Sequence, residues 1–407
     1  MCRPAALSAW IAELETVFLH LSKPQIKVLA QYSLGMVLAG RCGLSCVAFA
    51  LAGWLDQKVD AVRERLRDWY CGALDKSGRR RQELDVASCF GPLLAWVLQD
   101  WDAKELAIAL DATTLGRRFA VLAISVVYRA GAIPVAWAVL PATAKGAWKG
   151  RWLDLLGQFK SLAPSGLQVI VLADRGLYAK WLYQAIVSLG WHPFLRLNAT
   201  DNIHFRPSGG DYVPLASLLP ATGCCYSGVG TLFRTARTRL PCTLAACWKD
   251  GCREGWFVAS DLPPQQLDCA WYGLRSWIEC SFKQAKSGGW NWQQTRMSDP
   301  ERAARQWLAM AVAAVLLMRQ GAASETPSPP APSPADGTDG GEKSGAPPPK
   351  PDSTTPRRIL SVFRKGLLLV QAILLAGGPL PHARFEPEPW PRTPAALNTT
   401  APPEKPP

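Results

Sequence analysis

The chain has 407 residues, of which 48% are hydrophobic, enough for two or three domains with a sizeable core. This composition excludes a chain that is disordered throughout. The formal net charge of +13 favours an acidic partner, nucleic acid first. Most of the excess lies in residues 101–260, where 17 Lys and Arg stand against 9 Asp and Glu. We therefore expect a polyanion to lie against the middle of the chain and not against a basic tail.

The sequence predicts neither a secretory leader nor a membrane span. Residues 1–21 contain acidic side chains and have the pattern of an amphipathic helix. The apolar run at 307–318 is well short of the roughly 20 residues that a span requires. A second run, at 357–378, is interrupted by Arg364 and Lys365. We expect a cytoplasmic protein with no membrane contact, whose 12 cysteines are reduced.

Residues 1–100 have the pattern of several short helices. The stretch that begins at Ser22 has a capping serine, an early Pro24 and a closing Gly40. A basic loop, "DKSGRRRQELD", follows at 75–85. This pattern is compatible with a domain that binds DNA ends, and equally with an ordinary helical bundle.

The pattern changes at about residue 106, and residues 101–320 predict an α/β domain. Apolar stretches and amphipathic helices alternate in the order β-β-β-α-β-α-β up to about residue 198, which predicts a mixed sheet with helices on its faces. Residues 201–260 are rich in Gly, Thr and short β-like pieces, and we interpret them as a β-rich insertion. The run at 307–318 is expected to be a buried helix.

The C-terminal quarter is compositionally different. Residues 321–356 are rich in Pro, Gly, Ser and Asp, which predicts a disordered linker. A helix is expected over 357–378, and a second disordered, Pro-rich tail over 379–407.

Two acidic residues end apolar strands of the predicted sheet. Asp111 follows the run "LAIAL", and Asp174 follows "LQVIVLA". Ligands of α/β proteins bind at the carboxyl edge of the sheet, where such acids are presented. If the first and fourth strands are neighbours, both carboxylates emerge at the same end. Either acid taken alone is also compatible with an ordinary cap or strand-end residue.

A third carboxylate lies in "WYGLRSWIECSFKQAK", residues 271–286. On a helix of 100° per residue, Tyr272, Arg275, Glu279 and Lys286 fall within about 60° of one another, beside an apolar face. The pairs at i,i+4 in this stretch are also typical of a solvated helix surface. Packed against the sheet, however, the helix would bring Glu279 to the two aspartates.

Three converging carboxylates repel one another unless cations lie between them. Their hard oxygen ligands favour Mg²⁺ or Mn²⁺, and two such ions make a clamp for phosphoryl transfer. Arg275 and Lys286 would then bind phosphates, and Tyr272 would donate to a phosphate oxygen or stack. By contrast, a zinc site is not predicted, because five clustered cysteines lack a CxxC pair and a nearby histidine: Cys224, Cys225, Cys242, Cys247 and Cys252.

The spacing Tyr272-x2-Arg275-x3-Glu279-x6-Lys286 resembles the Tyr-Arg-Glu-Lys motif of bacterial cut-and-paste transposases of the insertion sequence 4 type. These belong to the DDE group and have a ribonuclease H-like catalytic fold. "LDATT" at 110–114 resembles the family's first-aspartate strand, and "LADRGLY" at 172–178 its second. A β-rich insertion between the second aspartate and the glutamate is also a family feature.

The resemblance implies that Asp111, Asp174 and Glu279 are catalytic residues that bind two Mg²⁺ ions, for which Mn²⁺ substitutes. It also implies Mg²⁺-dependent cleavage of transposon ends by water, then attack of the freed 3′-OH on target DNA by a DNA-bound dimer. Some members stack a flipped base on an aromatic side chain, for which Trp248 and Trp256 are the candidates. We expect both tryptophans rather to fill the small core of the insertion.

Three other functions compete with transposition. A transposase-derived protein that binds DNA without catalysis would not be expected to keep all three acids. A metal-dependent nuclease without strand transfer shares the first chemical step and is separated only by joined products. A structural or membrane-associated protein would leave the acids and the basic mid-chain unexplained.

Overall fold

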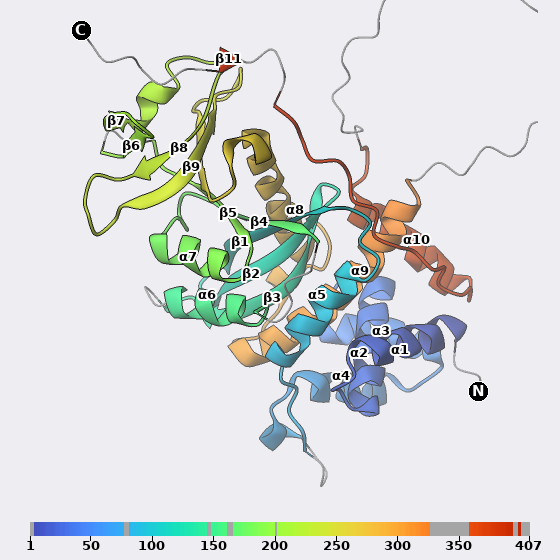
Figure 1. Cartoon of the computed structure of the whole chain (residues 1–407). Coiled ribbons are helices and arrows are strands. Elements are labelled where there is room, and N and C mark those ends of the chain that lie inside the picture. The colour runs from blue at the N-terminus through green and yellow to red at the C-terminus, as the bar shows by residue number, and fades with distance from the viewer. Residues whose placement is uncertain are drawn as a thin grey trace, which may run out of the picture.

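A computed structural model describes residues 4–76, 81–144, 148–160, 166–199, 202–325 and 358–393, and the short strand at 398–399. Its centre is a mixed sheet with helices on both faces (Figure 1). A helical region formed by the N-terminal residues lies at one end of the sheet, and a β-rich lobe lies at the other.

The first five strands of the sheet have the order β3-β2-β1-β4-β5. Strands β1, β2 and β3 are antiparallel neighbours, while β4 and β5 run parallel to β1. The predicted mixed α/β sheet is therefore confirmed, with α6 and α7 in the expected places and packed side by side. The bounds are β1 Glu105–Leu115, β2 Phe119–Tyr128, β3 Gly131–Pro141, α6 Trp148–Gly157, β4 Gln168–Ala173, α7 Lys180–Ser188 and β5 His192–Arg196.

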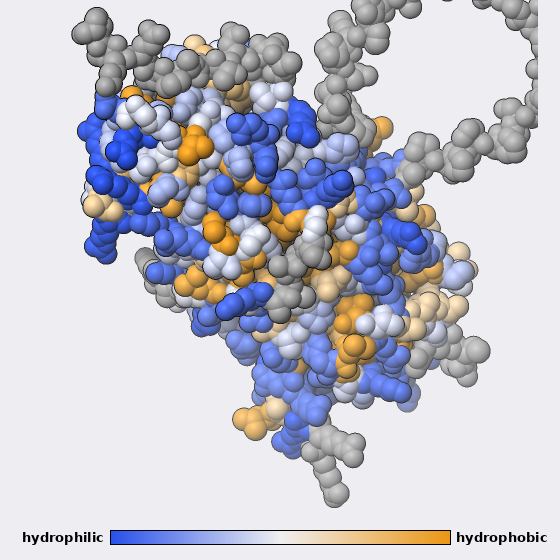
Figure 2. Space-filling model, viewed as in Figure 1, coloured by the Kyte–Doolittle hydropathy of each residue, from blue (hydrophilic) through white to orange (hydrophobic). Residues whose placement is uncertain are grey.

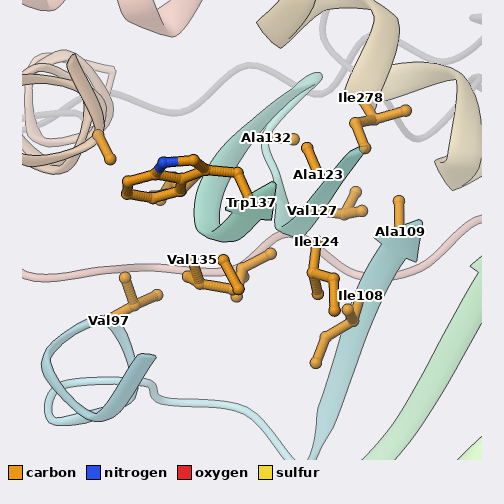
Figure 3. Close-up of a cluster of buried hydrophobic side chains, with 14 of the residues drawn as sticks. Val97, Ile108, Ala109, Ala123, Ile124, Val127, Ala132, Val135, Trp137 and Ile278 are labelled. Atoms are coloured by element: carbon orange, nitrogen blue, oxygen red, sulfur yellow. The ribbon is translucent and has the colours of Figure 1, made fainter. Parts of the chain in front are cut away.

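Both faces of this sheet are buried, which explains why its strands are mostly apolar and do not alternate. Every residue of β2 is buried. In Figure 3, Ile108 points toward Val97 of α5 (Phe90–Leu98), whereas the next residue, Ala109, points toward Ile278 of α8 (Trp277–Ala285). Successive side chains of β1 therefore contribute to two hydrophobic layers.

Residues 201–260 do not form a separate sheet. Strand β10 pairs with β5, so the sheet continues as β10-β9-β8-β6-β7, with β11 paired to β8. The bounds are β6 His204–Pro207, β7 Val213–Pro214, β8 Cys224–Leu232, β9 Leu240–Cys247, β10 Trp256–Ser260 and β11 Asn398–Thr399. The β-rich lobe is thus an extension of the central sheet (Figure 1).

In the described part of residues 1–100, five α-helices pack on one another, and α2 and α4 also contact α9. Ser22 and Gln25 form the capping box of α2, which ends at Gly40 in the left-handed conformation. Besides α5 the bounds are α1 Ala5–Val17, α2 Lys23–Ala39, α3 Leu44–Leu55 and α4 Val59–Tyr70. Six short 3₁₀ helices complete the described secondary structure: η1 Ala73–Asp75, η2 Ala87–Cys89, η3 Leu215–Leu218, η4 Pro264–Gln266, η5 Cys269–Ser276 and η6 Trp292–Gln294.

The apolar run predicted as a short buried helix lies inside a longer one, α9 (Pro300–Ala323). This helix is long and apolar enough to cross a membrane, but 94% of its most apolar window is buried within the protein. Helices α2 and α3 would reach such a length only as one broken span, bent by 96°. On the face in Figure 2, hydrophobic residues form small separate patches among hydrophilic ones.

Helix α10 (Val362–Leu375) crosses α9 with the two backbones in contact. A Cβ atom on Gly366 would lie 1.9 Å from the carbonyl oxygen of Leu317, and one on Gly321 would lie 1.9 Å from that of Val362. Glycine is therefore required at both positions of this crossing.

The tail was predicted to be disordered from residue 379, and for residues 379–393 this is wrong. They form an extended segment packed against the sheet domain (Figure 1). Phe385 is 1% exposed, with its ring 5.1 Å from that of Tyr128, and Trp390 packs 4.9 Å from Trp271. Aromatic anchors thus offset the cost of ordering a proline-rich chain. The linker predicted at 321–356 starts too early, because α9 continues to Ala323. The rest of it from residue 326, and residues 400–407, lie outside the described residues.

Candidate active site

The two aspartates are brought together by the register of two parallel strands. Leu110 of β1 pairs with Ala173 of β4, so Asp111 and Asp174 lie level at the carboxyl edge of the sheet. Asp111 is still within β1, which runs to Leu115, whereas Asp174 follows directly after β4.

Backbone hydrogen bonds orient both carboxyl groups. Oδ1 of Asp111 accepts from the backbone N–H of Ala112 at 2.8 Å, and Oδ1 of Asp174 accepts from that of Gly176. The other oxygen of each, Oδ2, faces the guanidinium of Arg275.

The stretch 271–286 is not one continuous α-helix, so the predicted geometry is wrong in detail. Tyr272 and Arg275 lie on the 3₁₀ helix η5, Glu279 on α8, and Lys286 at the non-helical C-cap. The 3₁₀ turn places i and i+3 on one side, and the α-turn does so for i and i+4. Tyr272, Arg275 and Glu279 consequently still face one side of the segment.

Arg275 contacts all three carboxylates. Its Nη2 donates to Oδ2 of Asp111 at 3.0 Å and to Oδ2 of Asp174 at 3.5 Å, and its Nη1 donates to Oε1 of Glu279 at 2.8 Å. Three acids from three separate elements therefore converge on one guanidinium.

The cluster is buried at one side and open at the other. The exposed fraction of the side chain rises from 17% for Asp111 to 38% for Asp174 and 54% for Glu279. Burial raises the pKa of Asp111, although the Arg275 guanidinium works in the opposite direction. A substrate would approach from the Glu279 side.

Lys286 lies next to the acids without contacting them. Its Nζ donates to Oγ1 of Thr113 at 2.7 Å, two residues beyond Asp111 on β1. Burial lowers the pKa of Lys286. Its ammonium is available to an anion near the cluster.

Tyr272 packs with aromatic and cationic side chains next to the acids. Its ring packs edge-on against Trp256 at 5.2 Å and lies under Arg196 at 5.7 Å. Burial raises the pKa of Tyr272 to about 12, so the hydroxyl remains a donor. Arg175 and Arg196 both pair with Glu254, at 3.1 and 2.6 Å.

Sequence reasoning missed Arg196 and Glu254. Arg196 ends β5, the strand next to β4. Its position at the end of a neighbouring strand could have indicated that it lies near Asp174. Glu254 lies in the β9–β10 loop, for which no sequence pattern was informative. The two tryptophans differ: Trp256 reaches the site through Tyr272, whereas the indole N–H of Trp248 donates to the carbonyl of Cys252 at 2.9 Å within that loop.

The donor set at the acids suits a hard divalent cation in its chemistry, because it consists of carboxylate oxygens. The guanidinium of Arg275 lies among these same oxygens. In the described parts of the chain, no group of three or more ligand residues is arranged to hold a metal ion.

The clustered cysteines are likewise not arranged as a metal site within the described ranges. Cys225 and Cys247 face each other across β8 and β9 with their sulfurs 2.8 Å apart. Burial raises the pKa of Cys225 to about 12, which disfavours the thiolate that zinc requires.

Comparison with known proteins gives one clear match. The family model described as "Transposase DDE domain" matches residues 102–316, more than half of the chain. No curated protein matches the chain.

Proposed function

Since the chain belongs to the transposase DDE domain family, we propose that it is a cut-and-paste transposase of the insertion sequence 4 type. It would cleave phosphodiester bonds at transposon ends and join the freed 3′-OH ends to target DNA in the cytoplasm. The observation that carries the proposal is the convergence of Asp111, Asp174 and Glu279 from β1, β4 and α8.

The three carboxylates would hold the divalent metal. Two Mg²⁺ ions, or Mn²⁺ in their place, would activate the attacking oxygen and stabilise the leaving one. Asp111 and Asp174 have one oxygen each fixed by a backbone N–H, which keeps the second oxygen directed inward.

The basic side chains around the acids would bind the DNA backbone. Lys286 and Arg275 are placed to grip phosphates, and Tyr272 is placed to donate from its hydroxyl. Of the two tryptophans, Trp256 is the better candidate for stacking a flipped base, because it packs on Tyr272. Trp248 remains the weaker candidate, since its indole N–H is bonded within its own loop.

In the first step a water oxygen attacks the phosphorus at the transposon end. The P–O3′ bond breaks, leaving a 3′-OH on one side and a 5′-phosphate on the other. In the second step that 3′-OH attacks a target phosphodiester, one P–O bond forms as another breaks, and the target's 3′-oxygen leaves with a proton.

We also propose roles for the flanking regions. The helical domain of residues 1–100 would bind the transposon ends, and residues 101–320 would carry catalysis. Residues 326–356 would act as a linker to the C-terminal helix. A dimer would form on DNA, because two ends must be cut and joined together.

The test uses purified full-length protein and a plasmid that carries the element's own ends. We expect Mg²⁺-dependent breaks at the ends and joined products from the wild type, and neither from Glu279→Ala. Asp102→Ala, which removes an exposed carboxylate away from the cluster, should behave as the wild type.

Two results would contradict transposition. Breaks without joined products would identify a metal-dependent nuclease that does not transfer strands. DNA binding without cleavage in any variant would identify a transposase-derived protein that has lost catalysis.

A further inference from the structure

The hydrogen bonds of Arg275 are divided among the acids. Both terminal nitrogens are used by Asp111, Asp174 and Glu279, at 2.8 to 3.5 Å. Its Nε is buried and has no hydrogen-bond partner among the described residues. The side chain as a whole is only 14% exposed. Arg275 therefore donates to all three carboxylates while one of its own donors remains unsatisfied.

A guanidinium and a divalent cation compete for the same oxygens. In the present arrangement one positive charge lies between three negative charges, which relieves most of their mutual repulsion. A divalent ion among the same oxygens would face that positive charge at short range. Metal binding and the three-way contact of Arg275 consequently exclude each other.

Arg275 is placed so that it can leave the acids. It lies in the last turn of η5, one residue before Ser276, where the 3₁₀ helix changes to α8, and such junctions are frequent hinge points. Its planar fork of donors matches two phosphate oxygens as well as it matches carboxylates. A phosphate on the open Glu279 side would accept from the terminal nitrogens of Arg275 once these leave the carboxylates.

We propose that Arg275 is a positioning residue that holds the three carboxylates together in the free protein and exchanges them for a DNA phosphate. Divalent-metal binding at the acids then depends on bound DNA. The free protein would have low metal affinity and would not cut DNA nonspecifically. This inference rests on the proposed function, since it takes the acids to be the metal ligands.

The test measures Mn²⁺ binding by electron paramagnetic resonance, with no activity involved. Without DNA, we expect Arg275→Gln to bind Mn²⁺ at least tenfold more tightly than the wild type. Arg275→Lys should lie between them, because an ammonium cannot bridge three carboxylates. It also serves as the second variant if the glutamine form does not fold. Asp111→Asn gives the background of sites elsewhere.

A matched control tests whether the loss of any nearby positive charge raises the Mn²⁺ affinity, or only the loss of the Arg275 contacts. Lys286→Gln removes a nearby positive charge that contacts Thr113 and not the acids. An equal gain in Mn²⁺ affinity for Lys286→Gln and Arg275→Gln would overturn the proposal, as would no gain for either arginine variant.

The second arm adds a duplex of the element's terminal sequence, with the Asp111→Asn signal subtracted. The duplex should tighten Mn²⁺ binding to the wild type at least tenfold and leave Arg275→Gln nearly unchanged. An equal response of both proteins would overturn the exchange. A gain for Arg275→Gln without DNA, together with no breaks by the wild type in the plasmid assay, would support the contact of Arg275 with the three carboxylates and contradict the transposase function.

Discussion

The Nζ atom of Lys286 donates a 2.7 Å hydrogen bond to Oγ1 of Thr113, across 173 residues of sequence. This bond joins the end of α8 to β1 two residues beyond Asp111. The bond fixes the position of the Lys286 ammonium relative to the acids. Without it, this long and flexible side chain would not keep one position.

Removing the acceptor should therefore disturb the site without removing a charge. For Thr113→Val we expect DNA-end cleavage to fall about tenfold, since a part-buried hydrogen bond to a charged group contributes roughly 1.5 kcal/mol. Thr113→Ser keeps the hydroxyl and should stay within about twofold of the wild type. The measurement is single-turnover cleavage of an end duplex, and equal rates for Val and Ser would show that the bond does not matter.

The crossing of α9 and α10 gives a prediction about stability. A Cβ atom on Gly366 would lie 1.9 Å from a backbone oxygen that cannot rotate away, so the two helices would have to separate. For Gly366→Ala we expect a loss of about 1–3 kcal/mol in the free energy of unfolding. This is the net loss, after the gain of about 1 kcal/mol that Ala usually brings to a helix.

Gly53→Ala is the matched control for this prediction. Gly53 lies in α3 with nothing within 4 Å of an added Cβ, so only helix propensity should act and the protein should become more stable. Denaturation by urea would measure both variants. A stabilising effect of Gly366→Ala would show that the close crossing does not occur in solution.

The fold of the sheet and the place of its two aspartates could be predicted because both are local properties of strands. An apolar run that ends in Asp111 or Asp174 places an acid at the strand's end, and the parallel connection brings the two ends together. The contacts of Arg275 could not be predicted, because they depend on the distance between α8 and the sheet. Over the few residues from 271 to 276, a period of 3 cannot be separated from one of 3.6.

The ordered tail shows why composition alone was misleading. Proline content made residues 379–393 resemble a disordered segment, whereas Phe385 and Trp390 each find an aromatic partner on the sheet domain. Thr393 also bonds through its backbone N–H to Asp268, the N-cap of η5, at 2.8 Å. The aromatic contacts of Phe385 and Trp390 order this segment. The amino-acid composition does not show where such residues lie in the chain or what they contact.

Acid should weaken the docking of α10 through Glu325. Burial opposes ionisation of Glu325, but hydrogen bonds from Lys365 at 2.7 Å and Arg358 at 2.9 Å lower the pKa of this carboxyl overall. A lowered pKa contributes stability above the unfolded value of about 4.3, and that stability is lost as the pH falls through the folded value.

For Glu325→Gln we therefore expect a loss of about 1.5–3 kcal/mol in the free energy of unfolding at pH 7. The difference from the wild type should shrink as the pH falls below about 4. Denaturant titrations between pH 3 and 7 would measure it, with exposed Glu15→Gln as control. A difference that stays constant with pH would show that the charge of Glu325 is not the cause.

The bond between Glu325 and Arg358 also closes a loop, because the chain leaves α9 and returns to α10 at almost the same point. The intervening residues 326–357 need only span a fixed, short gap, and the entropy of closing a loop rises by only about 0.6 kcal/mol for each doubling of its length. Sequence can therefore be added, shortened or replaced there at little thermodynamic cost. A reporter such as a fluorescent protein can therefore be inserted between α9 and α10 with little expected change in the free energy of unfolding.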